Sequence, residues 1–234
     1  MIVSINQPAY LPWLGYFDRI QRSDVHVVLD HVQFEKNSFT NRNKIKTKDG
    51  VLMLTVPVKT KGLFGALPIN TIEVVNDGWQ SKHLKSIQNA YGKAACFKDY
   101  AAVLSALYTT PYKCLIDVLT AFNGWFFQEL VPDRKIIYSS EMNIRGSKSQ
   151  LVLNICKELN ATTYLSGPFG RDYLDLESFR LSGIQVAFHD YVHPVFQQAY
   201  VGFEPYMSII DLILNHGKEG KKILNNNETE TIHR

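Results

Sequence analysis

The sequence predicts an α/β fold, with a mostly parallel sheet and flanking helices. Short apolar runs typical of buried strands alternate with amphipathic segments near both ends of the chain. Two strand-like runs with no helix between them indicate an antiparallel pair near 51–75. Residues 79–130 show helical periodicity and predict a helical segment. Together these three observations favour one domain in which a helical region is inserted into a parallel sheet.

The first thirty residues have the pattern of a strand–helix–strand unit. A buried strand is expected over 2–5, and Pro8 and Pro12 keep the following segment irregular. An amphipathic helix is expected over 13–23. The run over 25–30 is rich in β-branched residues and predicts a second buried strand. This order is typical of two parallel strands joined by a helix.

The middle of the chain is expected to leave the parallel sheet. Residues 31–50 are polar and predict a loop. Strands are expected over 51–58 and 71–75, joined by a loop that is rich in glycine and proline. The helices of the segment 79–130 are divided near Pro111.

The second half returns to alternating strands and helices. Ser147 and Gln150 have the spacing of a capping box at a helix start. Pro205 suits the first turn of the last helix, and Gly217 suits its end. The expected elements are, in order, a strand over 135–141, a helix from 147, a strand over 162–167, a helix over 172–182, a strand over 184–191 and a C-terminal helix.

Length and composition exclude several classes of protein. The chain has 234 residues, of which 45% are apolar and 20% charged, which excludes a disordered chain and a coiled coil. We expect one domain over 1–224 and a polar, frayed tail over 225–234. Lysine and arginine number 25 and aspartate and glutamate 22, a balance that suits an anionic small molecule better than a long nucleic acid.

Targeting and metal signals are also missing from the sequence. The start has no basic region before an apolar stretch, and polar residues interrupt the most apolar window, 115–131. We therefore expect a cytoplasmic protein without membrane insertion. Cys96, Cys114 and Cys156 are far apart and have no zinc-site spacing, so no metal site is expected.

None of the common short catalytic or nucleotide-binding signatures occurs, including the P-loop, GxGxxG, HExxH and GxSxG motifs. The site must therefore be sought by position. In open α/β sheets, ligands bind beyond the carboxyl ends of the strands. The candidate segments follow the predicted strands at Asn6, Asp30, Ser139, Ser166 and His189.

The segment 30–46 combines cations, amides and aromatic rings. Arginine and lysine suit phosphate, asparagine and glutamine suit sugar hydroxyls or a base edge, and a phenylalanine can stack on a ring. A solvated hairpin or loop with ordinary surface charges explains the same composition. The residues concerned are Gln33, Phe34, Lys36, Asn41, Arg42, Asn43 and Lys44.

Two later segments could also contribute. His189 or His193 could act as a general base near neutral pH, with Asp190 orienting one of them. Both histidines could equally be structural, His189 as a core residue. Gly167 is followed by Arg171 near a helix start, which is either an anion site or an ordinary strand-to-helix turn.

Residues 7–46, QPAYLPWLGYFDRIQRSDVHVVLDHVQFEKNSFTNRNKIK, resemble the WbqC-like protein family of bacterial polysaccharide loci. Further similar stretches lie at 79–94, 164–175 and 191–217, so the resemblance extends to about residue 224. The family opening often has histidine before Gln-Pro, whereas this chain has Asn6. Position 6 is therefore given no catalytic role.

The resemblance implies a function in O-antigen or related surface-polysaccharide biosynthesis. The leading prediction is a transferase that modifies a nucleotide-linked amino sugar, with transfer of glycine or another aminoacyl group to an amine. His193 or Asp30 would accept the amine proton. The predicted contacts are Lys36, Arg42 and Lys44 with the diphosphate, Gln7, Asn41, Asn43 and Gln197 with hydroxyls, and Tyr10, Trp13 and Phe34 as pocket walls, with Gln33, Ser166 and Gly167 as further binding residues.

The donor and the partners follow from what the sequence lacks. Without an ATP signature, no cofactor is expected, and the acyl group would come already activated from an aminoacyl-tRNA or a carrier protein. RNA contact would then involve residues 36–48. The alternatives are an ATP-using amide ligase and a non-catalytic protein that binds a glycan or a partner enzyme. The helices of 79–130 would support a homodimer or cover the sheet.

Overall fold

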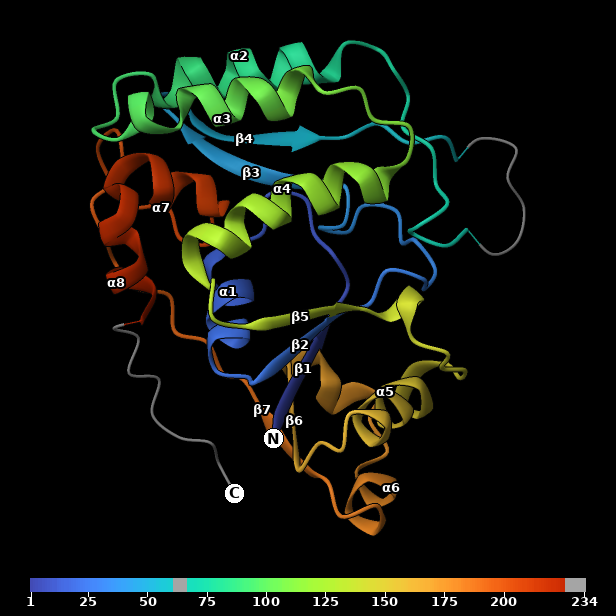
Figure 1. Cartoon of the computed structure of the whole chain (residues 1–234). Helices are drawn as coiled ribbons and strands as arrows, with labels where there is room; N and C mark the ends of the chain where they lie inside the picture. Colours follow the sequence, from blue (N-terminus) through green and yellow to red (C-terminus); the bar gives the residue numbers. More distant parts are fainter. Residues whose placement is uncertain (61–66, 226–234) are drawn as a thin grey trace.

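The computed structural model describes residues 1–60 and 67–225 and has an α/β fold, which confirms the predicted class (Figure 1). The expected tail falls almost wholly outside these ranges. The sheet has five parallel strands in the order β5-β2-β1-β6-β7. The strands are β1 (Ile2–Asn6), β2 (Val25–Val28), β5 (Lys135–Tyr138), β6 (Thr163–Ser166) and β7 (Gln185–Phe188).

The strand order reverses direction between β1 and β6. From β1 the chain continues through α1 (Leu14–Gln21) to β2, which lies beside β1 in the sheet. After β5 it returns through α5 (Lys148–Glu158) to β6 on the other side of β1. Such a reversal leaves a crevice at the carboxyl ends of the two central strands, where α/β proteins bind ligands.

Each face of the sheet packs against its own set of helices. On one face, α1 and α4 (Leu115–Leu130) share a core with Val28 of β2. On the other, α5 and α6 (Leu176–Leu181) cover alternate strand residues such as Val3 and Val27. Burial of both faces accounts for the continuous apolar character of the predicted strands.

Helix α1 has two different faces. Leu14, Phe17 and Ile20 are fully buried in the core, at the i, i+3, i+6 spacing of one helical stripe. Asp18 and Arg19 lie on the opposite side, toward the carboxyl edge of the sheet. The helix therefore anchors itself with one face and presents polar groups with the other.

The antiparallel pair is displaced from its expected position. It is a hairpin of β3 (Arg42–Thr47) and β4 (Gly50–Thr55), whereas 71–75 contributes only isolated bridges, such as that of Val74 with Val58. The predicted polar loop over 31–50 thus contains a strand. Its polar residues are held by specific bonds: the Nδ2 atom of Asn43 donates to the Leu11 carbonyl at 2.7 Å.

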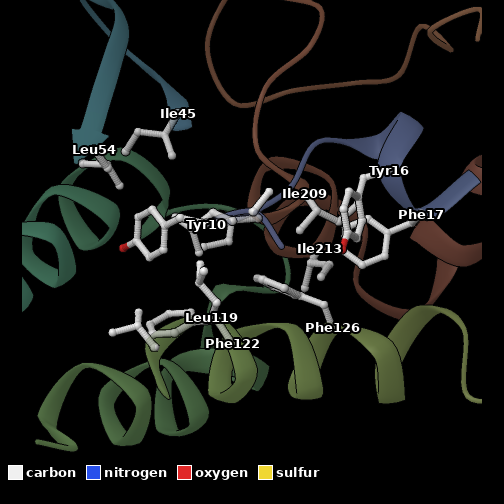
Figure 2. Packing of buried hydrophobic residues seen from close by; sticks show 14 of the residues in the cluster. Tyr10, Tyr16, Phe17, Ile45, Leu54, Leu119, Phe122, Phe126, Ile209 and Ile213 are labelled. Atoms are coloured by element: carbon white, nitrogen blue, oxygen red, sulfur yellow. The ribbon is translucent and has the colours of Figure 1, made fainter. Parts of the chain in front are cut away.

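The helical segment is confirmed as α2 (Trp79–Tyr91), α3 (Phe97–Thr109) and α4, with Pro111 between the last two. Helices α2 and α3 lie over the hairpin, and α4 lies between the hairpin and the parallel sheet (Figure 1). Figure 2 shows the core here, where Ile45 and Leu54 of the hairpin lie on one side of Tyr10 and Leu119 and Phe122 of α4 on the other. These helices therefore bury much of their apolar surface within the chain.

Three local expectations differ from the structure. Ser147 precedes α5 but its side chain makes no capping bond, and Gln150 instead donates to Asn154. The predicted C-terminal helix is α7 (Ile209–His216), which starts after Pro205. At its start the Ser208 hydroxyl accepts from the Ile210 amide. A short α8 (Gly220–Asn225) follows. The predicted helix over 172–182 is a 3-10 turn, Pro168–Asp172, followed by α6.

No helix in the described ranges is long and apolar enough to cross a bilayer.

Candidate functional site

A cavity of about 650 Å³ opens at the carboxyl edge of the sheet, where the strand order reverses. Asn6 ends β1, Gly167 directly follows β6, and His189 directly follows β7. Helix α1 forms another wall through Gly15 and Arg19. The position of the cavity matches the place where open α/β sheets bind ligands, and the volume of the cavity suits a small molecule.

Two residues from distant parts of the chain form an acid–base pair at this cavity. The Nε2 atom of His189 lies 2.5 Å from Oδ2 of Asp18, and both side chains are almost fully buried. Arg22 also contacts this carboxylate, at 2.7 Å from Nε. With the proton of His189 on Nε2, the carboxylate orients the ring and leaves the lone pair on Nδ1.

His189 lines the cavity, and its Nδ1 atom has no hydrogen-bond partner in the described part of the chain. This nitrogen is therefore the one that can take a proton from a bound molecule. The arrangement is chemically that of a general base with an orienting carboxylate.

Arg19 extends from α1 into the gap between β1 and β6. Its guanidinium donates to the Oδ1 atom of Asn6 and lies against Gly167, where any Cβ atom would overlap Nη1. Within residues 1–60 and 67–225, no carboxylate lies within ion-pair distance of Arg19. Burial lowers the pKa of this guanidinium, because the charged form loses hydration.

Aromatic rings form another part of the cavity wall. The Trp13 ring meets Tyr191 edge-on at 5.0 Å between centroids and Tyr206 at 5.6 Å. The indole also lies against Gly15 in the first turn of α1, where a Cβ atom would overlap it. The cavity is thus lined by both a cation and aromatic rings.

At the rim, Arg171 forms a two-pronged ion pair with Asp190, at 3.1 and 2.9 Å, and lies over the Phe188 ring. The candidate anion site at Arg171 is therefore neutralised by an acidic neighbour. Asp190 does not orient His189, since that position is held by Asp18.

Four of the residues that the sequence analysis assigned to binding meet in the cavity: Gln7, Trp13, Ser166 and Gly167. All four follow or flank the ends of β1 and β6. The remaining assigned residues lie elsewhere, in the core, on the surface or at a second cavity.

Tyr10 and Phe34 are core residues rather than pocket walls. Tyr10 is fully buried, and its hydroxyl lies 2.6 Å from that of Tyr108 and 2.9 Å from Nδ1 of His83. Burial raises the pKa of Tyr10 well above its usual value, so it stays a neutral phenol. Phe34 is also buried, in the same cluster.

Asp30 is buried and its carboxylate is occupied. It accepts from the hydroxyl of Ser139 at 2.9 Å and from the amide and hydroxyl of Ser140 at 2.8 and 2.6 Å. These bonds tie the end of β2 to the turn after β5. The carboxylate does not line the cavity at the reversal point.

The other residues of 30–46 hold the hairpin or lie on the surface. Asn41 and Asn43 are buried and donate to the carbonyls of Val56 and Leu11. Arg42 donates to Asn37, and Gln33 accepts from the Leu67 amide. Lys36 is exposed, Lys44 is half-buried, and neither lines the cavity.

His193 is enclosed by the rings of Tyr191, Phe196, Phe203 and Tyr206 and does not line the cavity. Burial lowers its pKa, which keeps it neutral. Gln197 lies at a second cavity of about 810 Å³ beside Lys48 and Lys93. Neither residue meets the acid–base pair.

No sequence motif assigns a role to Asp18 or Arg19. A signal was nevertheless present. Gly15, Asp18, Arg19 and Arg22 have the i, i+3, i+4, i+7 spacing of one stripe on the helix that follows the first strand. In a strand–helix–strand unit, such a stripe can face the carboxyl edge of the sheet.

No cluster of three or more His, Cys, Asp or Glu residues that could hold a metal lies in the described ranges.

Comparison with known proteins gives a family but no experimental activity. The model of the WbqC-like protein family matches residues 7–223, which include most of the residues that line the cavity. The chain is 32% identical over 224 residues to an uncharacterized protein of Mycobacterium tuberculosis, Rv1507c, covering 95% of this chain and 96% of that one. No solved structure matches the chain.

Proposed function

The chain belongs to the WbqC-like protein family, and from this premise we propose that it is a cytoplasmic transferase that acylates the amine of a nucleotide-linked sugar. The acyl group is glycine or another aminoacyl group, and the product serves surface-polysaccharide biosynthesis such as that of O-antigen. The observation that carries the proposal is the pair of Asp18 and His189 at the cavity of the sheet reversal. A protein that only binds a glycan has no need of an oriented base there.

Amide formation requires a neutral amine and a group that accepts its proton. In the proposed reaction the sugar nitrogen attacks the acyl carbonyl carbon, and a C–N bond forms. Nδ1 of His189 takes the proton from nitrogen, and Asp18 stabilises the resulting imidazolium. The C–O or C–S bond to the donor then breaks, and the donor's hydroxyl or thiol leaves with a proton.

The nucleotide part of the proposal is supported by topology and shape. The strand order is one in which nucleotides bind at the reversal point. The Trp13 indole offers a flat apolar surface for a sugar ring, and Gln7 and Ser166 offer polar groups for its hydroxyls. The donor is an aminoacyl-tRNA or a carrier thioester, in line with the missing ATP signature.

The test is an acyl-transfer assay on UDP- and dTDP-linked amino sugars, with glycyl-tRNA, a glycyl carrier thioester, or glycine plus ATP as donor. The acylated product is detected by mass spectrometry. We expect product with one preactivated donor, and a loss of about 100-fold or more in rate for His189→Gln. His216→Gln, outside this cavity, is the matched control and should retain wild-type rate.

Each alternative has its own result. If product forms only with glycine plus ATP, the protein is an amide ligase rather than a transferase. Binding of a nucleotide sugar without turnover for any donor would favour a non-catalytic binding protein. Equal rates for the wild type and His189→Gln would remove His189 from the mechanism.

A further inference from the structure

We infer that Arg19, Asn6 and Gly167 form an oxyanion subsite that binds the phosphate groups of the ligand in this cavity. The inference rests on the proposed function for the identity of the rest of that ligand. The residue set differs from that of the sequence analysis, which assigned phosphate to Lys36, Arg42 and Lys44. All three subsite residues line the cavity at the reversal between β1 and β6.

Charge favours an anion at Arg19. Two neighbouring arginines have carboxylate partners, since Arg22 pairs with Asp18 and Arg171 with Asp190. Arg19 has no such partner within the described ranges, and burial lowers the pKa of its guanidinium. A buried cation is costly to fold without a compensating charge. An anionic ligand in the cavity would supply that charge.

Unpaired hydrogen-bond donors at Arg19 and Asn6 also favour an anion. In the described part of the chain, Nε of Arg19 and Nδ2 of Asn6 are both buried and lack acceptors. Buried donors are nearly always satisfied in folded proteins, and an unsatisfied one costs about 1–3 kcal/mol. Two such donors on touching residues at one cavity indicate an acceptor-rich group, and a phosphate offers several oxygens. The planar guanidinium also fits two phosphate oxygens at once.

An aromatic ring at the start of α1 favours an anion at Arg19 rather than at the helix end. In nucleotide-binding α/β folds, phosphate commonly meets the N-terminus of the first helix. Here the Trp13 indole lies against Gly15 in the first turn of α1, and both residues line the cavity, so an aromatic ring borders that end of the helix. Gly167 has no side chain and leaves room for the guanidinium beside the end of β6. Arg19 thus takes the place of the helix N-terminus.

Isothermal titration calorimetry on the intact protein tests the subsite. The probes are UDP, inorganic pyrophosphate, uridine and free glycine, which separate phosphate from nucleoside and carboxylate. We expect UDP and pyrophosphate to bind, and uridine and glycine to bind at least about tenfold more weakly than UDP. Arg19→Gln should weaken UDP about 10- to 100-fold, whereas the surface control Arg42→Gln should leave it unchanged.

A second variant distinguishes loss of the subsite from misfolding of the Arg19→Gln protein. Gly167→Ala keeps every charge but places a methyl group over Nη1 of Arg19, so it should also weaken UDP binding. Circular dichroism and thermal melting without ligand show whether each variant is folded. Wild-type UDP affinity in folded Arg19→Gln, or equal affinity for UDP and uridine, would overturn the subsite.

The two proposals can fail separately. If Arg19→Gln loses UDP but no acyl transfer occurs with any donor, the subsite stands and the transferase function falls. If transfer to a phosphate-free amino sugar is as efficient as transfer to the UDP-linked sugar, the subsite falls and the transferase stands. Tight glycine binding that Arg19→Gln abolishes would identify a carboxylate site instead.

Discussion

Asp18 and His189 are 171 positions apart in the chain, yet Oδ2 of Asp18 lies 2.5 Å from Nε2 of His189. Asp18 is on α1, which follows the first strand, and His189 follows the last strand of the sheet. The pair therefore joins the two halves of the doubly wound sheet beside the cavity. The contact between Asp18 and His189 therefore depends on how those halves pack.

Asp18→Asn tests the pair with little change in shape. The amide can still contact His189, but it no longer stabilises an imidazolium and can favour the wrong tautomer. We expect kcat for acyl transfer to fall about 100- to 10,000-fold, with a small change in KM. Steady-state kinetics on the acceptor sugar measure both. Unchanged kcat would mean that the pair is structural.

The fold could largely be predicted from local pattern. The strands at 2–5 and 25–30 are continuous apolar runs, the helices of 79–130 have helical periodicity, and all of them appear close to their expected bounds. The strand β3 was missed because its stability does not come from an apolar pattern. Its buried Asn43 and Lys46 are held by bonds to other segments, including donation from Lys46 to the Gly202 carbonyl, which local sequence does not show.

The place of the cavity could be predicted from strand order, but most of the residues that line it could not. Strand order gave the carboxyl edge, and Gln7, Trp13, Ser166 and Gly167 lie there. The cation-rich segment 30–46 attracted the phosphate assignment by composition, yet its amides are used by the hairpin. Asp18 and Arg19 gain their chemistry from tertiary partners, and a single sequence carries no record of those partners.

Tyr10→Phe should affect stability and leave ligand binding unchanged. The variant removes a buried hydroxyl and leaves Tyr108 and His83 without that partner, at a cost of about 1–3 kcal/mol in free energy of unfolding. Urea denaturation measures the loss, and UDP titration measures binding. Tyr112→Phe, at a half-buried tyrosine that donates to the Leu107 carbonyl, is a control with a smaller expected loss. Weakened UDP binding in folded Tyr10→Phe would restore Tyr10 as a pocket residue.

Asp30→Asn separates the structural and catalytic views of Asp30. The carboxylate accepts bonds from Ser139 and Ser140, and an amide can match only part of this set, so we expect a loss of about 2–3 kcal/mol in stability. Transfer rate per folded molecule should not change. Asp49→Asn, in the exposed hairpin turn, is the matched control and should change neither quantity. A large fall in kcat with a normal melting temperature would make Asp30 catalytic after all.

Asp211 is a fully buried carboxylate on α7, under the loop that follows β7. Gln198 donates to it at 2.8 Å, and Asn215 lies within 3.4 Å. Burial raises the pKa of Asp211 to about 6, although bonds from Tyr91 and Gln198 and the charges of Lys46 and His216 oppose this shift. The fold therefore favours the neutral acid over the carboxylate.

The sign of the resulting pH effect follows from proton linkage. Between the unfolded pKa of 3.8 and the folded value of about 6, the folded chain holds more protons, so the contribution of Asp211 to stability falls as pH rises. The shift corresponds to about 3 kcal/mol across this window. Asp211→Asn removes the titration, so its stability relative to wild type should rise between pH 4 and pH 7. Urea denaturation of both proteins at these pH values measures the difference, and a difference that is constant with pH would show that Asp211 titrates normally.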